Sequence, residues 1–248
     1  MNAIYILWLR ELKKYVRSRT QIVASLAQPL LYLLALGFGL GPVFQRAGAG
    51  SYLQFVAPGV IGMMVLFTSM FSSISLLWDR QFGFLKETLV APVPRILVMF
   101  GRTLGGATVA MLQGALMVVV CLIAGFRPAS LRAMPLALLF ILLIAFVFVA
   151  LGVSVGSSLQ DMQGFQLIMS FLVMPIFFFS GALFPLDHLP RGLAALITVD
   201  PLSYGVDGLR ATLIGAAHFG VLMDLGVLAP ISVGLLCLGA WRFSRIAI

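Results

Sequence analysis

The sequence predicts an all-α polytopic membrane protein with six transmembrane helices. Of the 248 residues, 61% are apolar and 10% are charged, whereas soluble domains are typically about half apolar and a quarter charged. The mean hydropathy is +1.11. The charges are also separated by long uncharged windows, each near the roughly 20 residues that cross a bilayer core. These observations argue against a water-soluble enzyme and against a disordered chain.

Each uncharged window is assigned one membrane-spanning helix. The windows are residues 20–45, 47–78, 103–126, 133–160, 162–186 and 225–241. The last window is the shortest, but it is still long enough to cross the hydrocarbon core. Because the cations punctuate apolar stretches and do not gather on a soluble face with aromatic residues between them, the net charge of +8 does not indicate nucleic-acid binding.

The distribution of cations predicts that both termini lie in the cytoplasm, since Lys and Arg are retained on that side. With this orientation, eleven cations fall on the inner side and five on the outer side. The inner set is Arg10, Lys13, Lys14, Arg17, Arg19, Arg80, Lys86, Arg95, Arg102, Arg242 and Arg245, and the outer set is Arg46, Arg127, Arg132, Arg191 and Arg210. No cleavable signal peptide is recognised at the charge-rich start of the chain.

Residues 1–19 are predicted to form an amphipathic interfacial helix. Ile4, Trp8, Leu12 and Tyr15 share one helical face, and the cations of this segment lie on another. Such a helix lies in the headgroup plane, with its apolar face toward the acyl chains. It serves equally well as a topology anchor or as a contact with a partner.

Within the spans, small and polar residues predict helix packing. Pro29 and Pro58 are expected to weaken or kink their helices, and the glycine-rich residues 37–41 are expected to end the first span. Close helix approach is expected at Gly101, Gly105, Gly106, Gly152 and Gly156. Gln113 is expected to make hydrogen bonds between helices, and Arg102 to extend its side chain to the membrane surface.

The cytoplasmic segment 79–94, between spans two and three, is predicted to contain a short interfacial helix. Phe82, Leu85 and Leu89 recur at helical spacing, and Pro92 ends the pattern. A loop that only reconnects two spans does not require such an element. The segment is therefore interpreted as a docking surface.

The outer segment 180–220, between spans five and six, is predicted to form short re-entrant helices. Its prolines and its apolar pieces, residues 193–199 and 209–214, suggest helices that enter the outer leaflet and return. Asp207 and Arg210 are three residues apart and are expected to pair on one helical face.

The chain is not expected to carry out catalysis. It contains no Gly-x-x-x-x-Gly-Lys-Ser/Thr phosphate loop, no His-Glu-x-x-His spacing and no Gly-x-Ser-x-Gly elbow. Cys121 and Cys237 lie in apolar runs, without metal-ligand spacing. Since the centres of the spans also lack the ionisable residues of a proton or ion pathway, the energy for transport must come from a separate ATPase.

The order of several motifs resembles the permease subunit of type 2 ABC exporters over nearly the whole chain. The motifs are the basic N-terminal helix, Tyr52-Leu53-Gln54-Phe55-Val56-Ala57-Pro58-Gly59, the loop from Asp79-Arg80 to Ala91-Pro92-Val93-Pro94-Arg95, Phe179-Ser180-Gly181-Ala182-Leu183-Phe184-Pro185, and Asp200-Pro201-Leu202-Ser203-Tyr204-Gly205-Val206-Asp207-Gly208-Leu209-Arg210. Gln81 and Asp200 stand where relatives often carry Glu and Asn, so the roles of these two residues are left open.

The resemblance implies a single transmembrane domain, residues 1–248, with a coupling helix in the 79–94 loop and an outer gate region at 185–220. It implies two partner ATP-binding cassette subunits that bind ATP and Mg²⁺, a second permease copy or close relative, and the bacterial plasma (inner) membrane. Carried over by residue, the ATPase-coupling residues are Arg80, Phe82, Lys86 and Glu87. The outer gate residues are Asp200, Pro201, Tyr204, Asp207 and Arg210.

The expected function is ATP-driven export of a hydrophobic or amphipathic substrate, drug-like or lipid-like, because the spans offer no polar pathway for a small hydrophilic solute. Export of a lipid-linked oligosaccharide or polysaccharide is the second possibility. A membrane scaffold without transport activity is the alternative from another class. An intramembrane enzyme is the least favoured, because the nucleophile and metal constellations are missing.

Overall fold

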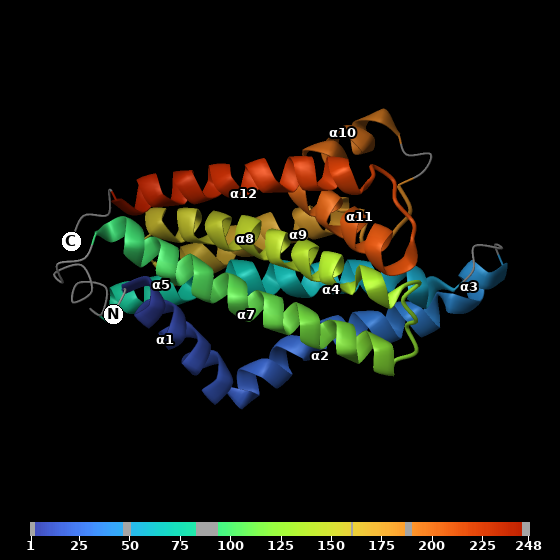
Figure 1. Cartoon of the computed structure of the whole chain (residues 1–248), viewed down its shortest axis with the longest axis horizontal. Coiled ribbons are helices and arrows are strands. Elements are labelled where there is room, and N and C mark those ends of the chain that lie inside the picture. Colours follow the sequence, from blue (N-terminus) through green and yellow to red (C-terminus); the bar gives the residue numbers. More distant parts are fainter. Residues whose placement is uncertain (1–2, 47–50, 83–93, 160, 187–189, 245–248) are drawn as a thin grey trace.

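Long helices run side by side along the longest axis of the computed structural model, which describes residues 3–46, 51–82, 94–159, 161–186 and 190–244 (Figure 1). The helices are α1 (Ala3–Arg17), α2 (Arg19–Gly39), α3 (Gly41–Arg46), α4 (Tyr52–Ser72), α5 (Ile74–Gln81), α7 (Arg95–Ile123), α8 (Met134–Ser158), α9 (Met162–Phe179), α10 (Arg191–Val199), α11 (Pro201–Ile214) and α12 (Val221–Ser244), with a 3-10 turn, η1, at Leu131–Ala133.

The six predicted spans are confirmed as six helical segments within the described part of the chain. Their bounds are Arg19–Gly39, Tyr52–Asp79, Arg95–Ile123, Leu131–Ser158, Met162–Phe179 and Val221–Arg242. The start of α1 and the end of α12 lie at the same end of the bundle, which we call the terminal end (Figure 1). At the opposite, distal end lie α3, α10 and the turn from α11 to α12.

Two spans continue through charged residues that bounded the uncharged windows. Helix α7 begins at Arg95 and contains Arg102, and α12 begins at Val221 and contains Asp224. Arg102 and Asp224 are both buried. The predicted extension of Arg102 to the membrane surface is therefore wrong, because its side chain is held inside the protein by the partner described below.

The core is built around α4, α8 and α11. Most of α11 is buried, including its polar residues Ser203, Asp207 and Arg210. Glycines allow the close approach: a side chain at Gly208 would strike the ring of Phe140 in α8, and one at Gly59 would strike the backbone of Ala182. The short helices predicted in the segment 180–220 are thus present as α10 and α11. Their depth in a membrane stays a prediction.

Helix α1 packs against the first half of α7. Gly101 faces Ile4 and Leu7, and Gly105 faces Glu11. Trp8 Nε1 donates a hydrogen bond of 3.0 Å to Thr108 Oγ1. The predicted close contacts of small residues are confirmed here. They are also confirmed at Gly152, which faces the residue between α4 and α5, and at Gly156, which faces α5. The predicted position of α1 in the headgroup plane stays a prediction.

The prolines do not interrupt their helices. Pro29 and Pro58 are buried within continuous α2 and α4, and the breaks in the path of the chain fall instead at Ser18 and Ser73. Neighbouring helices pack around both prolines, which is how membrane helices tolerate them. Helix α2 ends at Gly39, as the glycine-rich run predicts.

Candidate functional site

A partly buried cluster of charges, in which only Arg10 is substantially exposed, lies at the terminal end, where α5 leads into the predicted coupling loop (Figure 1). Arg10 from α1 and Arg102 from α7 both donate through Nη2 to Oδ2 of Asp79 in α5. The side chains of Asp79 and Arg102 are 11% and 5% exposed. We call Arg10, Asp79 and Arg102 the Asp79 cluster. It ties three helices together at the base of the 79–94 segment.

The predicted coupling residues lie beside this cluster or beyond the described residues. Phe82 is 60% exposed, and its ring stacks on Trp78 with centroids 5.3 Å apart. Gln81 is exposed as well. The side chain of Arg80, all of Lys86 and Glu87, and the predicted short helix after Phe82 lie outside the described residues.

Asp200, Pro201 and Tyr204 build the junction between α10 and α11. The Oδ1 atom of Asp200 caps α11 by accepting a 2.9 Å hydrogen bond from the backbone N–H of Leu202. Pro201 occupies the first position of the helix, where its missing donor costs nothing. Tyr204 Oη donates to the carbonyl of Thr198 over 2.8 Å. Asp200 therefore provides the cap that the sequence left open.

The expected pair between Asp207 and Arg210 is wrong. Asp207 accepts hydrogen bonds from the backbone N–H groups of His218 and Phe219, at 2.8 and 2.7 Å to the nearer oxygens. Arg210 instead donates to the carbonyls of Gly181 and Ala182 at 2.7 and 3.2 Å. Each side chain satisfies backbone groups of a turn, because unpaired backbone groups buried in the protein are costly.

Arg210 also lies against an aromatic ring. Its guanidinium carbon is 4.0 Å from the ring centroid of Phe55 in α4, a favourable cation–π geometry. Burial lowers the pKa of Arg210 to about 10, against the nearby charges of Asp207 and Tyr52, which raise it. The side chain thus stays charged at neutral pH and joins α11, α4 and the turn after α9.

Asp200 predicts a measurable pH dependence of stability. Burial raises the pKa of Asp200 to about 7, although the hydrogen bond from Leu202 lowers it. The folded protein therefore keeps a proton on Asp200 that the unfolded chain releases at about pH 4. As the pH rises from about 4 to 7, the free energy of unfolding should fall because of this residue, by up to about 1.4 kcal/mol per pH unit.

The variant Asp200→Asn keeps a capping oxygen and is expected to lose this part of the pH dependence. Thermal unfolding of the purified protein in detergent, followed from pH 4 to 8, measures it. The matched control is Asp161→Asn, at the exposed N-cap of α9, which should keep the wild-type profile. If Asp200→Asn loses stability with pH as steeply as the wild type does, the assignment fails.

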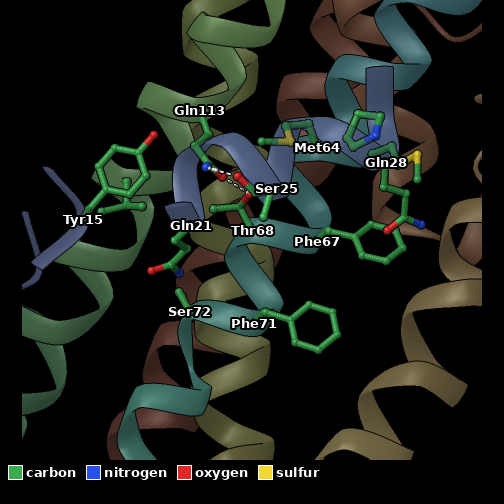
Figure 2. A pocket seen from close by; sticks show the side chains of 14 residues that line it. Tyr15, Gln21, Ser25, Gln28, Met64, Phe67, Thr68, Phe71, Ser72 and Gln113 are labelled. Atoms are coloured by element: carbon green, nitrogen blue, oxygen red, sulfur yellow. Dashed lines mark hydrogen bonds between the residues drawn. The ribbon is translucent and has the colours of Figure 1, made fainter. Parts of the chain in front are cut away.

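A cavity of about 380 Å³ opens between α1, α2, α4 and α7 (Figure 2). Its hydrogen-bonding residues are Tyr15, Gln21, Ser25, Gln28, Thr68, Ser72 and Gln113. Its apolar residues are Ala24, Pro29, Met63, Met64, Phe67, Phe71 and Val109. The described lining is therefore uncharged, but it is rich in amide and hydroxyl groups.

A chain of hydrogen bonds fixes the orientation of Gln113 at one side of this cavity (Figure 2). Thr68 Oγ1 donates to Gln113 Oε1, and Gln113 Nε2 donates to Ser25 Oγ. Ser25 Oγ in turn donates to the carbonyl of Ile22 over 2.9 Å. The predicted interhelical role of Gln113 is confirmed, because the chain of bonds joins α7, α4 and α2.

The Asp79 cluster and the cavity were not predicted from the sequence. In the sequence, Asp79 is the first residue of a predicted loop and Arg102 lies near the end of a predicted span. A signal was present, since opposite charges close the second span and open the third, on the same predicted side of the membrane. The cavity has no such signal, because its lining comes from four separate helices.

Comparisons with known proteins agree on one family. The profile of the family described as ABC-2 type transporter matches residues 2–214. The chain is 30% identical over 230 residues to Nodulation protein J of Rhizobium leguminosarum bv. trifolii, covering 90% of this chain and 83% of that protein. It is 26% identical over 228 residues to the inner membrane transport permease YadH of Escherichia coli K12, covering 91% and 88%.

Proposed function

Because the chain belongs to the ABC-2 type transporter family, we propose that it is the permease subunit of an ATP-driven exporter. Its substrate is a hydrophobic or amphipathic molecule, drug-like or lipid-like, which leaves the cytoplasm or the inner leaflet. Since the sequence has no phosphate loop, two partner ATP-binding cassette subunits bind ATP and Mg²⁺ and hydrolyse the nucleotide.

The observation that carries this proposal is the Asp79 cluster at the base of the 79–94 segment. Arg10 and Arg102 hold Asp79 from two sides, so a push on the segment is transmitted directly to α1 and α7. Phe82 is exposed immediately beyond the cluster, where a large aromatic side chain can anchor a partner protein. This arrangement supports contact with the ATPase through Arg80, Phe82, Lys86 and Glu87.

A second permease copy completes the transporter. Apolar side chains on α2 and α9 are exposed, including Val23, Leu31, Phe38, Leu167 and Phe171. In the bacterial inner membrane, such faces meet lipid or another membrane helix. The common location of the start of α1 and the end of α12 (Figure 1), together with the cations of these helices, supports cytoplasmic termini.

The uncharged, hydroxyl- and amide-rich lining of the cavity supports an amphipathic substrate, which in this proposal enters from the cytoplasmic half of the membrane. In this proposal, the junction and turns held by Asp200, Pro201, Tyr204, Asp207 and Arg210 form the outer gate. Export of a lipid-linked oligosaccharide or polysaccharide would use the same machinery.

Replacing Phe82 and Glu87 together by alanine is expected to uncouple export. Loss of an aromatic anchor and a charge at the ATPase contact should lower substrate export by more than about tenfold, because interface hot spots contribute roughly 2 kcal/mol or more. The measurement is export from cells, with co-purification of the ATPase in gentle detergent.

The control for this double variant is Leu131→Ala, an exposed apolar residue in the η1 turn that is far in sequence from the 79–94 segment, which should leave both readouts unchanged. Full export by the double variant would contradict the coupling role. If the wild-type permease purifies without any ATP-binding cassette protein, under conditions that keep a known transporter intact, the scaffold interpretation is favoured.

A further inference from the structure

The cavity between α1, α2, α4 and α7 has the chemistry of a binding site for an uncharged polar group. Among its described lining residues, none carries a charge. A charged ligand group placed there would lose its hydration without gaining a counter-charge, which is strongly unfavourable. Hydroxyl and amide groups of a ligand, by contrast, would meet donors and acceptors on several sides.

Two glutamines of α2 provide hydrogen-bonding groups that the protein itself does not use. Gln21 and Gln28 line the cavity and are exposed. Unlike Gln113, neither amide has a hydrogen-bond partner among the described residues. A primary amide in an apolar membrane span needs a partner, and Gln28 lies near the middle of α2. A ligand in the cavity would supply that partner.

Two aromatic rings complete the site. Phe67 and Phe71 project from α4 on the side of the cavity where Gln28 lies (Figure 2), and their ring centroids are 6.2 Å apart with nearly parallel planes. Aromatic faces pack well against the apolar C–H surface of a ligand, while nearby amides bind its polar groups. Apolar rings beside unpaired amides suit a molecule that has both kinds of surface.

We propose that this cavity binds the hydroxyl- or amide-bearing head of an uncharged amphiphile and selects against anionic heads. The Phe67 and Phe71 rings pack against the ligand, and the Gln21 and Gln28 amides bind its polar groups. Gln113 is fixed by Thr68 and Ser25 and shapes one wall. As a substrate site, this assignment rests on the proposed exporter function; as a binding site, it is tested without the ATPase.

The test uses two photoreactive probes with the same alkyl chain, one with a glucoside head and one with a phosphate head. The full-length permease is reconstituted in phosphatidylcholine nanodiscs, labelled, and digested for mass spectrometry. The glucoside probe is expected to label the α4 peptide that contains Phe67 and Phe71, in a saturable manner. The phosphate probe should label this peptide about tenfold less, and unlabelled alkyl glucoside should compete.

The variant Gln28→Leu removes the unpaired amide at nearly constant volume and should lower saturable glucoside labelling about tenfold. Its matched control is Gln163→Leu, an exposed glutamine of α9 outside the cavity, which should label like the wild type. Because Gln28 is exposed and bonds to no described residue, its replacement is not expected to impair folding. Thermal unfolding of both variants verifies this point.

Three results would overturn the proposal. The first is equal labelling of α4 by the phosphate probe. The second is competition by an alkanol of the same chain length, which has no sugar head, as strong as by the alkyl glucoside. The third is labelling that is confined to other helices. The readout is independent of the ATPase. Failure here with normal ATPase co-purification therefore removes only the cavity assignment, and intact labelling without a co-purifying ATPase removes only the exporter proposal.

Discussion

Replacing Asp79 by alanine is expected to give a poorly folded permease with export close to background. The change leaves Arg102 buried in the bundle, with two fewer charge-assisted bonds joining α1, α5 and α7. Removing one partner of a buried ion pair typically costs about 3–5 kcal/mol, because the remaining charge is uncompensated. The measurements are the yield of monodisperse protein in detergent, its melting temperature and substrate export.

The double variant Asp79→Ala, Arg102→Ala distinguishes the loss of the ion pair from the cost of leaving Arg102 buried without a partner. It should melt at a higher temperature than Asp79→Ala alone, since no unpaired guanidinium remains buried. Asp161→Asn, which keeps a capping oxygen at an exposed helix cap, is the control for loss of an aspartate charge as such. Wild-type stability in Asp79→Ala would show that the cluster does not hold the three helices together.

Replacing Gly59 by alanine is expected to destabilise the distal end of the bundle. The added Cβ would lie 2.3 Å from the carbonyl oxygen of Ala182 and 2.9 Å from two other backbone atoms of that residue. Backbone atoms cannot rotate away as a side chain does, and the same carbonyl accepts a hydrogen bond from Arg210. Overpacking of this kind typically costs about 1–3 kcal/mol.

For a chain of this length, that cost lowers the melting temperature by roughly 2–4 °C per kcal/mol. The matched control is Gly226→Ala in α12, where a new Cβ would meet nothing within 4 Å and helix propensity improves. The control should melt at or above the wild-type temperature. If Gly59→Ala and Gly226→Ala melt alike, the close contact between α4 and the turn after α9 is not as tight as described.

The features that could be predicted from the sequence are those set by composition and local period. Six spans, the N-terminal helix and the short distal helices follow from apolar windows and from residue spacing. Interhelical bonding by Gln113 follows from the cost of an unpaired amide in hydrocarbon. Each of these predictions depends only on residues within a few helical turns of one another.

The partners of the charged residues could not be predicted in this way. The local spacing of Asp207 and Arg210 suggested a pair, yet each side chain binds the backbone of a distant turn. Arg102 was expected to reach the membrane surface because it lies near one end of its span. Its partner, Asp79, is 23 residues earlier. In both cases the partner is determined by the packing of helices that are distant in sequence. The lining of the cavity, which comes from four helices, is determined in the same way.

The contact of Arg210 with the turn after α9 has a consequence for biosynthesis. The carbonyls of Gly181 and Ala182 are satisfied by a side chain that emerges from the ribosome 28 to 29 residues later. Until then, these two carbonyls lack the hydrogen bonds that Arg210 donates to them in the folded protein. The turn after α9 is therefore completed only after α11 has been synthesised.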